Sequence, residues 1–376
     1  MLTLAEIGCW GSALVLVHVF FGYPACVWLQ ARLWPHPVHK SSVTPTVTVV
    51  MAAYEAAAQI RAKLANLQAL DYPPEKIDII IVCDGSRDAT AAVCADVADA
   101  RVRVLQFSKR RGKAACLNDA IAAAGGDVLL FTDIRQTISP TALRELVANL
   151  ADPAVGAVSG ELQMENLHRG FEQGIDAYWR YEKLIRHAEG RSGSTIGVTG
   201  ALYAMRRELF IPLPPGTVLD DVLIPMRVAA AGKRVVFEPR ALVWDRPSTQ
   251  LADEQRRKVR TLAGNYQLVQ LAPWLLAPWS NPLWFRFVSH KLLRLLAPWL
   301  MVLLTLSSLV LTARHPVYWL VVAAFLVGTA LVLTGSVLPR AGRWLPIRLL
   351  MAFFYLNLFA AQALIAFARN RELHLW

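Results

Sequence analysis

The chain has 376 residues, and its 39 Lys and Arg residues outnumber its 28 Asp and Glu residues, giving a formal charge of +11 at pH 7. Apolar types make up 55% of the residues and charged types only 18%, a composition that excludes an intrinsically disordered chain. It also argues against a nucleic-acid partner, because nucleic-acid-binding proteins gather their basic residues in a polar, soluble domain. A mean hydropathy of +0.37 instead predicts a membrane protein whose basic residues lie beside the bilayer.

The first predicted element is a membrane span. Residues 7–29 contain no charged side chain, and about 20 apolar residues are enough to cross a bilayer. A cleaved signal peptide is the alternative, but Glu6 is the only early charge and the apolar run is too long. We therefore predict a permanent transmembrane helix in residues 1–30. Arg32 and Lys40 follow it, which places the next segment in the cytoplasm.

Residues 41–265 read as a soluble domain in which strands alternate with helices. The strand segments are short runs rich in β-branched residues, as is typical of buried parallel strands. This alternation predicts an α/β domain with a doubly wound, mostly parallel sheet. The predicted strands are residues 47–51, 77–82, 101–105 and 127–132, and the predicted helices between them are residues 56–70, 88–98 and 113–124.

Polar residues interrupt this pattern where the strands end, in residues 52–55, 83–86 and 133–136. Ligands of open α/β sheets bind at the carboxyl ends of the strands, so the sequence predicts a ligand site at this edge. No GxGxxG follows the first strand, and GxxxxGK[ST] is absent from the chain. A dinucleotide-dependent dehydrogenase and a P-loop ATPase are therefore disfavoured.

Residues 266–292 are aromatic, interrupted by prolines and sparsely charged. Such a segment between a polar domain and a membrane span predicts amphipathic helices in the membrane interface. The alternative is a core segment of the soluble domain.

Three more spans are predicted within residues 293–376, at about residues 295–313, 317–338 and 349–368. Arg340, Arg343 and Arg348 place the loop before the last span in the cytoplasm. Asn357 and Gln362 lie within that span, where polar side chains form helix–helix hydrogen bonds or line a channel.

Six motifs of the polar domain occur in a fixed order. They read AAYEAAAQI, DYPPEKIDIIIVCDGSRDAT, RRGKAACLNDAI, LLFTDIRQ, GVTGALYAMRREL and LDDVLIPMRVAAAGKRVVFEP. Over residues 47–260 this order resembles the membrane-embedded family 2 glycosyltransferases, which include cellulose, hyaluronan and poly-N-acetylglucosamine synthases. The resemblance implies a GT-A-like α/β domain in the cytoplasm, combined with α-helical transmembrane segments.

The resemblance implies that Tyr54, Glu55 and Asp84 bind the uridine of a UDP-sugar. A carboxylate suits this role because the N3–H group of uracil needs an acceptor. The alternative for Asp84 is an Asx turn at the end of its strand. The sequence departs from many relatives at Cys83 and at Glu55.

Lys113 and Asn118 are implied to contact the donor diphosphate or the uridine. Arg110 and Arg111 precede them, and basic residues near a helix N-terminus favour a phosphate. A solvated basic loop is the alternative.

Asp133 occupies the first position of the DxD signature of the family, which holds Mg²⁺ or Mn²⁺ against the donor diphosphate. The second position is Arg135, and an arginine cannot ligate a cation but can bind a diphosphate directly. Two expectations follow: either Asp133 holds the metal with fewer protein ligands, or Arg135 partly replaces the metal.

Asp220 and Asp221 match the acidic motif of the family, with Asp221 in the place of the general base. Asp220 is expected to orient the acceptor or to act on its neighbour by charge repulsion. The alternative is a pair of acids that stabilises the first turn of a helix. Thr199 and Gly200, in the run GVTGALYAMRR, lie where relatives place the acceptor sugar, although the glycines of this run could equally mark a loop.

Residues 254–260 stand where processive relatives carry QxxRW. Gln255 fits the motif and is implied to bind the acceptor, whereas Val259 replaces the tryptophan and so removes an aromatic stacking surface. The cations of this segment are expected to bind the donor or, alternatively, anionic lipid headgroups; they are Arg257, Lys258 and Arg260. Upstream, Glu182 and Arg186 are one helical turn apart and predict an ion pair.

The function expected from these motifs is inverting transfer of a sugar from a UDP-sugar to a growing exopolysaccharide at a bacterial inner membrane. Transfer of a single sugar to a lipid-linked acceptor is the alternative, and a non-catalytic membrane scaffold with a decayed transferase fold is a second one. Membrane lipids are expected partners, together with a second copy of the chain or other polysaccharide-synthesis subunits. No nucleic acid is expected.

Overall fold

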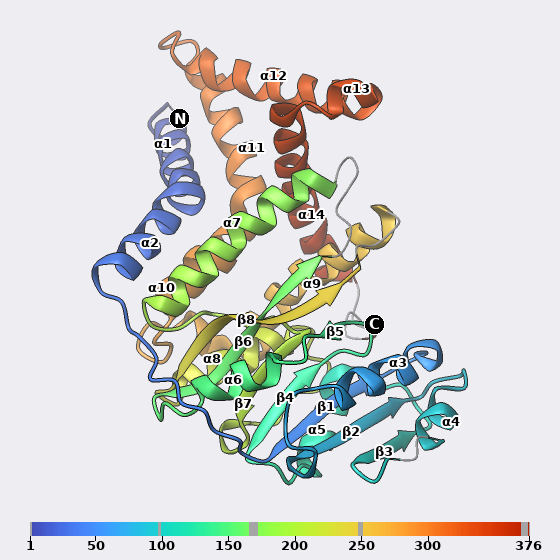
Figure 1. Cartoon of the computed structure of the whole chain (residues 1–376). Coiled ribbons are helices and arrows are strands. Elements are labelled where there is room, and N and C mark those ends of the chain that lie inside the picture. The colour runs from blue at the N-terminus through green and yellow to red at the C-terminus, as the bar shows by residue number, and fades with distance from the viewer. Residues whose placement is uncertain (1, 97–98, 165–171, 247–250, 370–374, 376) are drawn as a thin grey trace.

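The computed structural model of the chain describes residues 2–96, 99–164, 172–246, 251–369 and 375. Figure 1 shows a sheet flanked by helices in the lower part and long helices that rise above it. Helix α7 (Glu172–Arg191) runs between the two parts. In the upper part, helices from the two ends of the chain pack together, because α1 (Leu2–Val17) contacts α11 (Leu293–Leu311).

The lower part is built around one sheet with the strand order β3-β2-β1-β4-β7-β6-β8-β5. The first four strands in this order are parallel, which confirms the predicted doubly wound half. β7 is antiparallel to both of its neighbours, β4 and β6, so the other half of the sheet is mixed. The strands are β1 Val47–Ala53, β2 Ile77–Asp84, β3 Val102–Phe107, β4 Val128–Thr132, β5 Thr137–Ile138, β6 Val155–Met164, β7 Leu202–Arg206 and β8 Arg234–Asp245.

Parallel pairing aligns the ends of the strands that the sequence predicted to bear the ligand site. Ala53 of β1 lies opposite Cys83 of β2, and Val50 lies opposite Phe131 of β4. The polar residues that follow β1, β2 and β4 therefore leave the sheet at the same edge.

Helices cover both faces of the sheet. Successive residues of a strand point to opposite faces, so neighbouring residues of β1 pack in different hydrophobic cores. Val49 and Met51 of β1 pack in one hydrophobic core with α3 and α6, whereas Val50 and Ala52 pack in a second core with α5 and α8. These helices, with α4 and α9, are α3 Ala57–Gln68, α4 Thr90–Ala95, α5 Lys113–Ala122, α6 Ala142–Asn149, α8 Asp220–Ala230 and α9 Leu251–Leu271.

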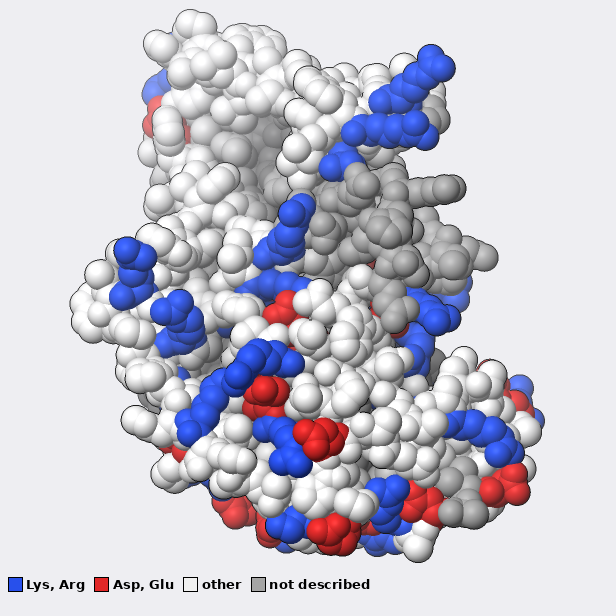
Figure 2. All heavy atoms as spheres, viewed as in Figure 1, with Lys and Arg blue, Asp and Glu red and all other residues white. Residues whose placement is uncertain are grey.

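Four helices are long and apolar enough to cross a membrane: residues 2–33, 284–311, 318–337 and 345–369. Their positions match the four predicted spans. On the face shown in Figure 2, their surface carries few charged side chains, whereas the sheet domain carries many of both signs. The component helices not yet given are η1 His18–Gly22, α2 Tyr23–Leu33, α10 Trp284–Phe287, η5 Val288–Leu292, α12 Tyr318–Val337, α13 Pro339–Gly342 and α14 Leu345–Arg369.

The segment 266–292 does not form separate helices over its whole length. Its first residues complete α9, and the turn η4 (Pro273–Leu276) separates them from the helix that begins at Trp284. Leu275 and Phe287 are buried in the second core, as the alternative interpretation expected, whereas the side chain of Trp279 is 87% exposed. The placement of its exposed side in the lipid interface stays a prediction.

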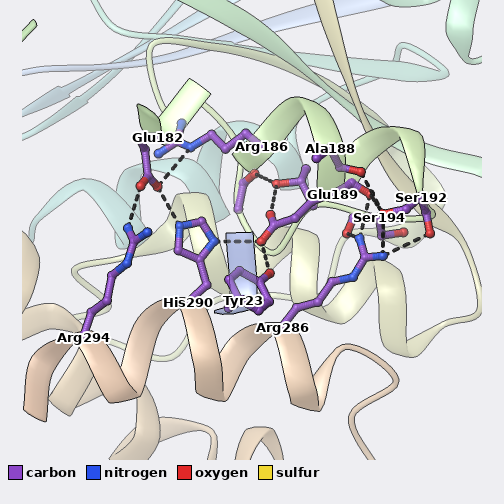
Figure 3. Close-up of polar contacts among 12 residues, drawn as sticks. Tyr23, Glu182, Arg186, Ala188, Glu189, Ser192, Ser194, Arg286, His290 and Arg294 are labelled. Atoms are coloured by element: carbon purple, nitrogen blue, oxygen red, sulfur yellow. Dashed lines mark hydrogen bonds and ion pairs between the residues drawn. The ribbon is translucent and has the colours of Figure 1, made fainter. Parts of the chain in front are cut away.

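A buried polar cluster joins the sheet domain to the membrane helices. His290 of η5 lies between two carboxylates of α7: its Nδ1 is 2.7 Å from Oε1 of Glu189, and its Nε2 is 2.9 Å from Oε1 of Glu182. Both ring nitrogens thus lie within hydrogen-bonding distance of a carboxylate oxygen. The Tyr23 hydroxyl of α2 donates a hydrogen bond to Glu189. We call this cluster the clasp; its members are Tyr23, Glu182, Glu189, Arg286, His290 and Arg294 (Figure 3).

The remaining cations of the clasp hold the same helix. Arg294 donates to Oε2 of Glu182 at 2.7 Å, and Arg286 donates to the backbone carbonyls of Glu189 and Ser194, both at 2.6 Å. Burial alone would raise the pKa of both glutamates, but the electrostatic interaction and the hydrogen bonds with His290 lower the pKa below its ordinary value. Buried carboxylates thus connect the membrane helices with the domain below.

Candidate active site

A cavity of about 880 Å³ lies at the carboxyl ends of β1 and β4 and extends to the membrane helices. Its walls come from distant parts of the chain, as expected for a site assembled at the edge of an α/β sheet. Twelve of the residues predicted to act in the site line it, namely Tyr54, Glu55, Lys113, Asp133, Arg135, Thr199, Gly200, Asp220, Asp221, Arg257, Lys258 and Arg260.

Lys113, the first residue of α5, connects two predicted acids at the centre of the cavity. Its Nζ lies 3.1 Å from Oδ1 of Asp133 and 3.4 Å from Oδ2 of Asp220. Burial would lower the pKa of Lys113, but the charges of Asp133, Asp220 and Asp221 outweigh it and raise the pKa. Lys113 therefore carries a positive charge that is fixed between the carboxylates.

Asp220 is buried at the start of α8, and burial together with the charges of Asp221 and Asp133 raises its pKa to about 6, although Lys113 acts in the opposite direction. Below this pH the carboxyl is neutral and no longer holds Lys113 by charge. We expect kcat/KM to fall between pH 7.5 and 5, approaching about tenfold per pH unit below the pKa. The check is the initial rate of turnover measured across this range.

The Asp220→Asn variant has no carboxyl that can titrate at this position. We expect its kcat/KM to be lower than that of the unaltered protein at every pH and to show no fall near pH 6. A flat profile of the unaltered protein from pH 7.5 to 5 contradicts the assignment.

Asp221 follows in the first turn of α8, where the helix N-terminus stabilises a carboxylate. Its backbone oxygen accepts the N–H of Val198 at 2.9 Å. A Cβ atom at Gly200 would lie 3.4 Å from Oδ2 of Asp221, so the absence of a side chain there lets the loop approach the acid. Thr199 and Gly200 thus belong to a loop beside Asp221, and their contact with an acceptor stays a prediction.

The sequence analysis did not predict a role for Lys63, which binds the residues on either side of Asp133. Lys63 is buried, and its ammonium donates to the Thr132 hydroxyl and to the Gln136 carbonyl, both at 2.8 Å. Burial lowers its pKa to about 7, against the opposing charge of Asp133. The available signal was a lysine on the apolar face of a helix, between Ile60 and Leu67.

The structure shows which groups Asp84 binds within the chain, whereas its expected contact with a uridine stays a prediction. Its side chain is buried and does not line the cavity. Its two oxygens accept the backbone N–H groups of Arg111 and Gly112, each at 2.8 Å. Gly112 has a φ of 89°, a conformation that favours glycine. Asp84 therefore holds the basic loop that precedes Lys113.

Asn118 and Gln255 also bind protein groups outside the cavity. The Asn118 amide both donates to and accepts from the backbone of Leu213, at 2.9 and 2.8 Å. Gln255 donates to Gln362 of α14 at 2.9 Å, which confirms the helix–helix hydrogen bond predicted for Gln362. Asn118 thus fixes a loop and Gln255 contacts a membrane helix, and the ligand contacts expected of these two residues stay predictions.

Helix α9 brings three cations to the cavity. Arg257 is paired with Glu254 at 2.6 Å. Lys258 lies over the ring of Trp179, 4.6 Å from its centroid. Arg260 also lines the cavity. Burial lowers its pKa, and the charges of Asp220 and Asp133 oppose this shift. Trp179 comes from α7, so an aromatic surface is present although Val259 lacks one.

The sequence model described as glycosyltransferase like family 2 matches residues 45–264, which is more than half of the chain. The chain belongs to this family. It is therefore a glycosyltransferase. Its four long apolar helices agree with the prediction, made from the motifs, that the enzyme is associated with a membrane.

Two curated relatives have related activities. Poly-beta-1,6-N-acetyl-D-glucosamine synthase of Staphylococcus aureus is 25% identical over 230 residues, which cover 59% of this chain and 55% of that protein. An N-acetylglucosaminyltransferase of Azorhizobium caulinodans is 26% identical over 312 residues, which cover 78% of this chain and 77% of that protein. The glycosyltransferase thus spans about half the length of its staphylococcal relative.

A solved structure shares the fold. It is mannosyltransferase PcManGT from Pyrobaculum calidifontis in complex with GDP-Man and Mn²⁺, with a TM-score of 0.72 and 23% identity, covering 96% of this chain and 99% of that chain. The likeness supports the GT-A-like fold predicted from the motifs.

The residues around Asp133 fit a divalent cation that is bound chiefly by a substrate. Among the described residues, no group of three or more His, Cys, Asp or Glu side chains could hold a metal ion. Arg135 forms a bidentate ion pair with Asp245, at 2.9 and 2.6 Å, so its guanidinium is already engaged by a carboxylate. Asp133 remains as an accessible carboxylate, and Mg²⁺ is often held by one carboxylate together with substrate phosphates.

Proposed function

We propose that this glycosyltransferase transfers a sugar from a UDP-sugar, with inversion, to a hydroxyl of a membrane-held glycan. The observation that carries the proposal is the single cavity that contains Lys113, Asp133 and Asp221 and continues to the membrane helices. A nucleotide-sugar at the sheet edge and an acceptor arriving from the membrane would meet there.

In the proposed reaction, Asp221 removes the proton of the acceptor hydroxyl as its oxygen attacks the anomeric carbon. The bond from that carbon to the UDP oxygen breaks on the opposite face, so one displacement inverts the configuration and needs no covalent intermediate. Lys113 and Arg260 place positive charge where the leaving diphosphate gains negative charge. Tyr54 and Glu55 line the same cavity and are proposed to contact the donor.

We propose that Asp133 holds Mg²⁺ or Mn²⁺ together with the donor diphosphate. The bound cation would neutralise the charge of the diphosphate. Arg135, fixed by Asp245, is then proposed to add a cationic wall and not to replace the metal.

Two forms of the reaction are distinguished by the acceptor. Extension of an exopolysaccharide is supported by the staphylococcal relative, whose name states a polymer synthase. Transfer of one sugar to a lipid-linked acceptor is supported by Val259, which stands in the place of the tryptophan in QxxRW. Trp179 supplies an aromatic wall in the cavity that could stack on a sugar in either form.

We further propose that the enzyme lies in a bacterial inner membrane with its sheet domain in the cytoplasm. Arg32 and Lys40 follow the first apolar helix, and Arg340, Arg343 and Arg348 precede the last one, which supports this orientation.

The size of the product tests the proposal. Purified full-length enzyme in lipid is given radiolabelled UDP-N-acetylglucosamine or UDP-glucose with Mn²⁺, and the product is separated by organic extraction and gel filtration. We expect labelled product and inverted configuration, and about a tenfold or greater loss of rate with EDTA. A large product digestible by glycosidases identifies polymer extension, and a small extractable one identifies single transfer. No transfer from any UDP-sugar overturns the proposal.

A further inference from the structure

The membrane end of the cavity is lined by basic side chains that the transfer reaction does not use. Arg186 extends from α7, Lys291 from η5 and Arg294 from α11, and all three line the cavity. Figure 3 shows Arg186 and Arg294 approaching the same carboxylate, Glu182, from opposite sides. We call these three residues the basic end of the cavity.

The carboxylates near the basic end are already shared among several cations. Glu182 is 3.6 Å from Arg186, as the sequence predicted, and it also binds His290 and Arg294, at 2.9 and 2.7 Å. In Glu189, Oε1 binds Tyr23 and His290 of the clasp, and Oε2 accepts from the Thr195 hydroxyl at 3.2 Å. Within the part of the chain that the structure describes, Lys291 has neither an ion-pair partner nor a hydrogen-bond partner. The basic end therefore has an excess of positive charge.

An apolar wall continues from the basic end. It includes Phe20 from η1 and a row of α14 residues, Leu349, Phe353, Leu356 and Ala360, with one polar residue, Asn357, beside them. η1 and α14 belong to two of the four helices that are apolar and long enough to span a membrane. A ligand at the basic end would thus contact cations on one side and hydrocarbon on the other.

We propose that Arg186, Lys291 and Arg294 bind the phosphate of a lipid-linked acceptor, whose lipid chain lies against the apolar wall. The inference rests on the proposed function, because it names the class of acceptor. Guanidinium groups bind phosphate oxygens with paired hydrogen bonds, and a phosphate supplies the negative charge that the basic end lacks. The sugar attached to that phosphate would extend through the cavity toward Asp221.

A lipid-linked acceptor fits this arrangement better than the donor does. The donor diphosphate has its own cation, Lys113, beside Asp133 at the edge of the sheet. The basic end lies instead where η5 and α11 leave the domain as a membrane helix. A phosphate held there would anchor the acceptor while its sugar is presented to the base.

Binding of a lipid phosphate without turnover tests the inference. Full-length enzyme in detergent is titrated with a polyisoprenyl monophosphate, with the corresponding polyisoprenol and with inorganic phosphate, and complexes are measured by native mass spectrometry. We expect the lipid phosphate to bind about ten- to hundredfold more tightly than the alcohol. Lys291→Gln is expected to remove most of that difference, and Lys291→Arg is expected to keep it.

The matched control is Lys233→Gln, a half-buried lysine whose ammonium donates to the carbonyl of Pro153, and the affinity of this variant is expected to equal that of the unaltered protein. Equal binding of alcohol and phosphate overturns the inference, and so does competition by phosphatidylglycerol at equal concentration, which would mark a site for bulk lipid. If Lys291→Gln lowers the melting temperature, the comparison with Lys291→Arg decides. Because the titration needs no donor, failure of sugar transfer would leave this result standing, and the reverse also holds.

Discussion

Replacing Asp221 by asparagine is expected to reduce kcat by about 10²–10⁴-fold, the range that a positioned general base contributes. Asparagine keeps the size of the side chain and the contact with Gly200, where a Cβ atom would lie 3.4 Å from the acid. It cannot accept the proton of the acceptor hydroxyl. The measurement is the initial rate of UDP release with saturating donor and acceptor.

The control for Asp221→Asn is Glu75→Gln, which removes one negative charge from an exposed turn far from the cavity lining. Its kcat is expected to remain within about twofold. Binding of the UDP-sugar to Asp221→Asn is measured separately, because a lost base should affect the chemical step and not the donor site. A kcat within tenfold of the unaltered enzyme, at unchanged donor binding, would assign the proton transfer to another group.

The second large effect is expected at His290. Alanine at this position would leave Glu182 and Glu189 buried without the imidazole that now lies within 2.9 Å of both. Removing one partner of a buried ion pair costs about 3–5 kcal/mol, because the other charge remains in an apolar environment. We expect His290→Ala to lower the stability of the purified enzyme by this order, measured by fluorescence during unfolding in detergent.

Two further variants separate the clasp from a general effect of histidine removal. His36→Ala changes an exposed histidine and is expected to alter stability little. Adding Glu189→Gln to His290→Ala removes one of the stranded charges, so the double variant should lose less than the sum of the single losses. Simple additivity of the two losses would contradict the coupling.

Local patterns predicted half of the sheet and the four apolar helices. The strands β1, β2, β3 and β4 are β-branched runs separated by helices with regular spacing, so their pairing follows from general rules for parallel strands. The antiparallel β7 was not predicted. It has only five residues and is buried nearly throughout, so neither an alternating pattern nor its length distinguishes it from a helix segment.

The site was predicted where the chain fixes a side chain locally, and missed where distant partners decide. The positions of Asp133 and Asp221 could be predicted because Asp133 directly follows a strand and Asp221 lies in the first turn of a helix. Asp84 also ends a strand, but its oxygens are satisfied by backbone N–H groups of residues 27 and 28 positions later. The clasp joins His290 to carboxylates more than 100 positions earlier, a pairing that no local pattern contains.

The second hydrophobic core includes residues from both sides of the predicted domain boundary. Leu219 and Val222 beside the acidic pair pack in the same cluster as Leu275 and Phe287, and Phe287 is already part of a helix that continues into the bilayer segment. During synthesis, the helix that carries Asp221 therefore cannot acquire its final packing until the ribosome has delivered the following apolar segment. Completion of the core behind Asp221 is in this way tied to synthesis of the segment that leads into the apolar helices.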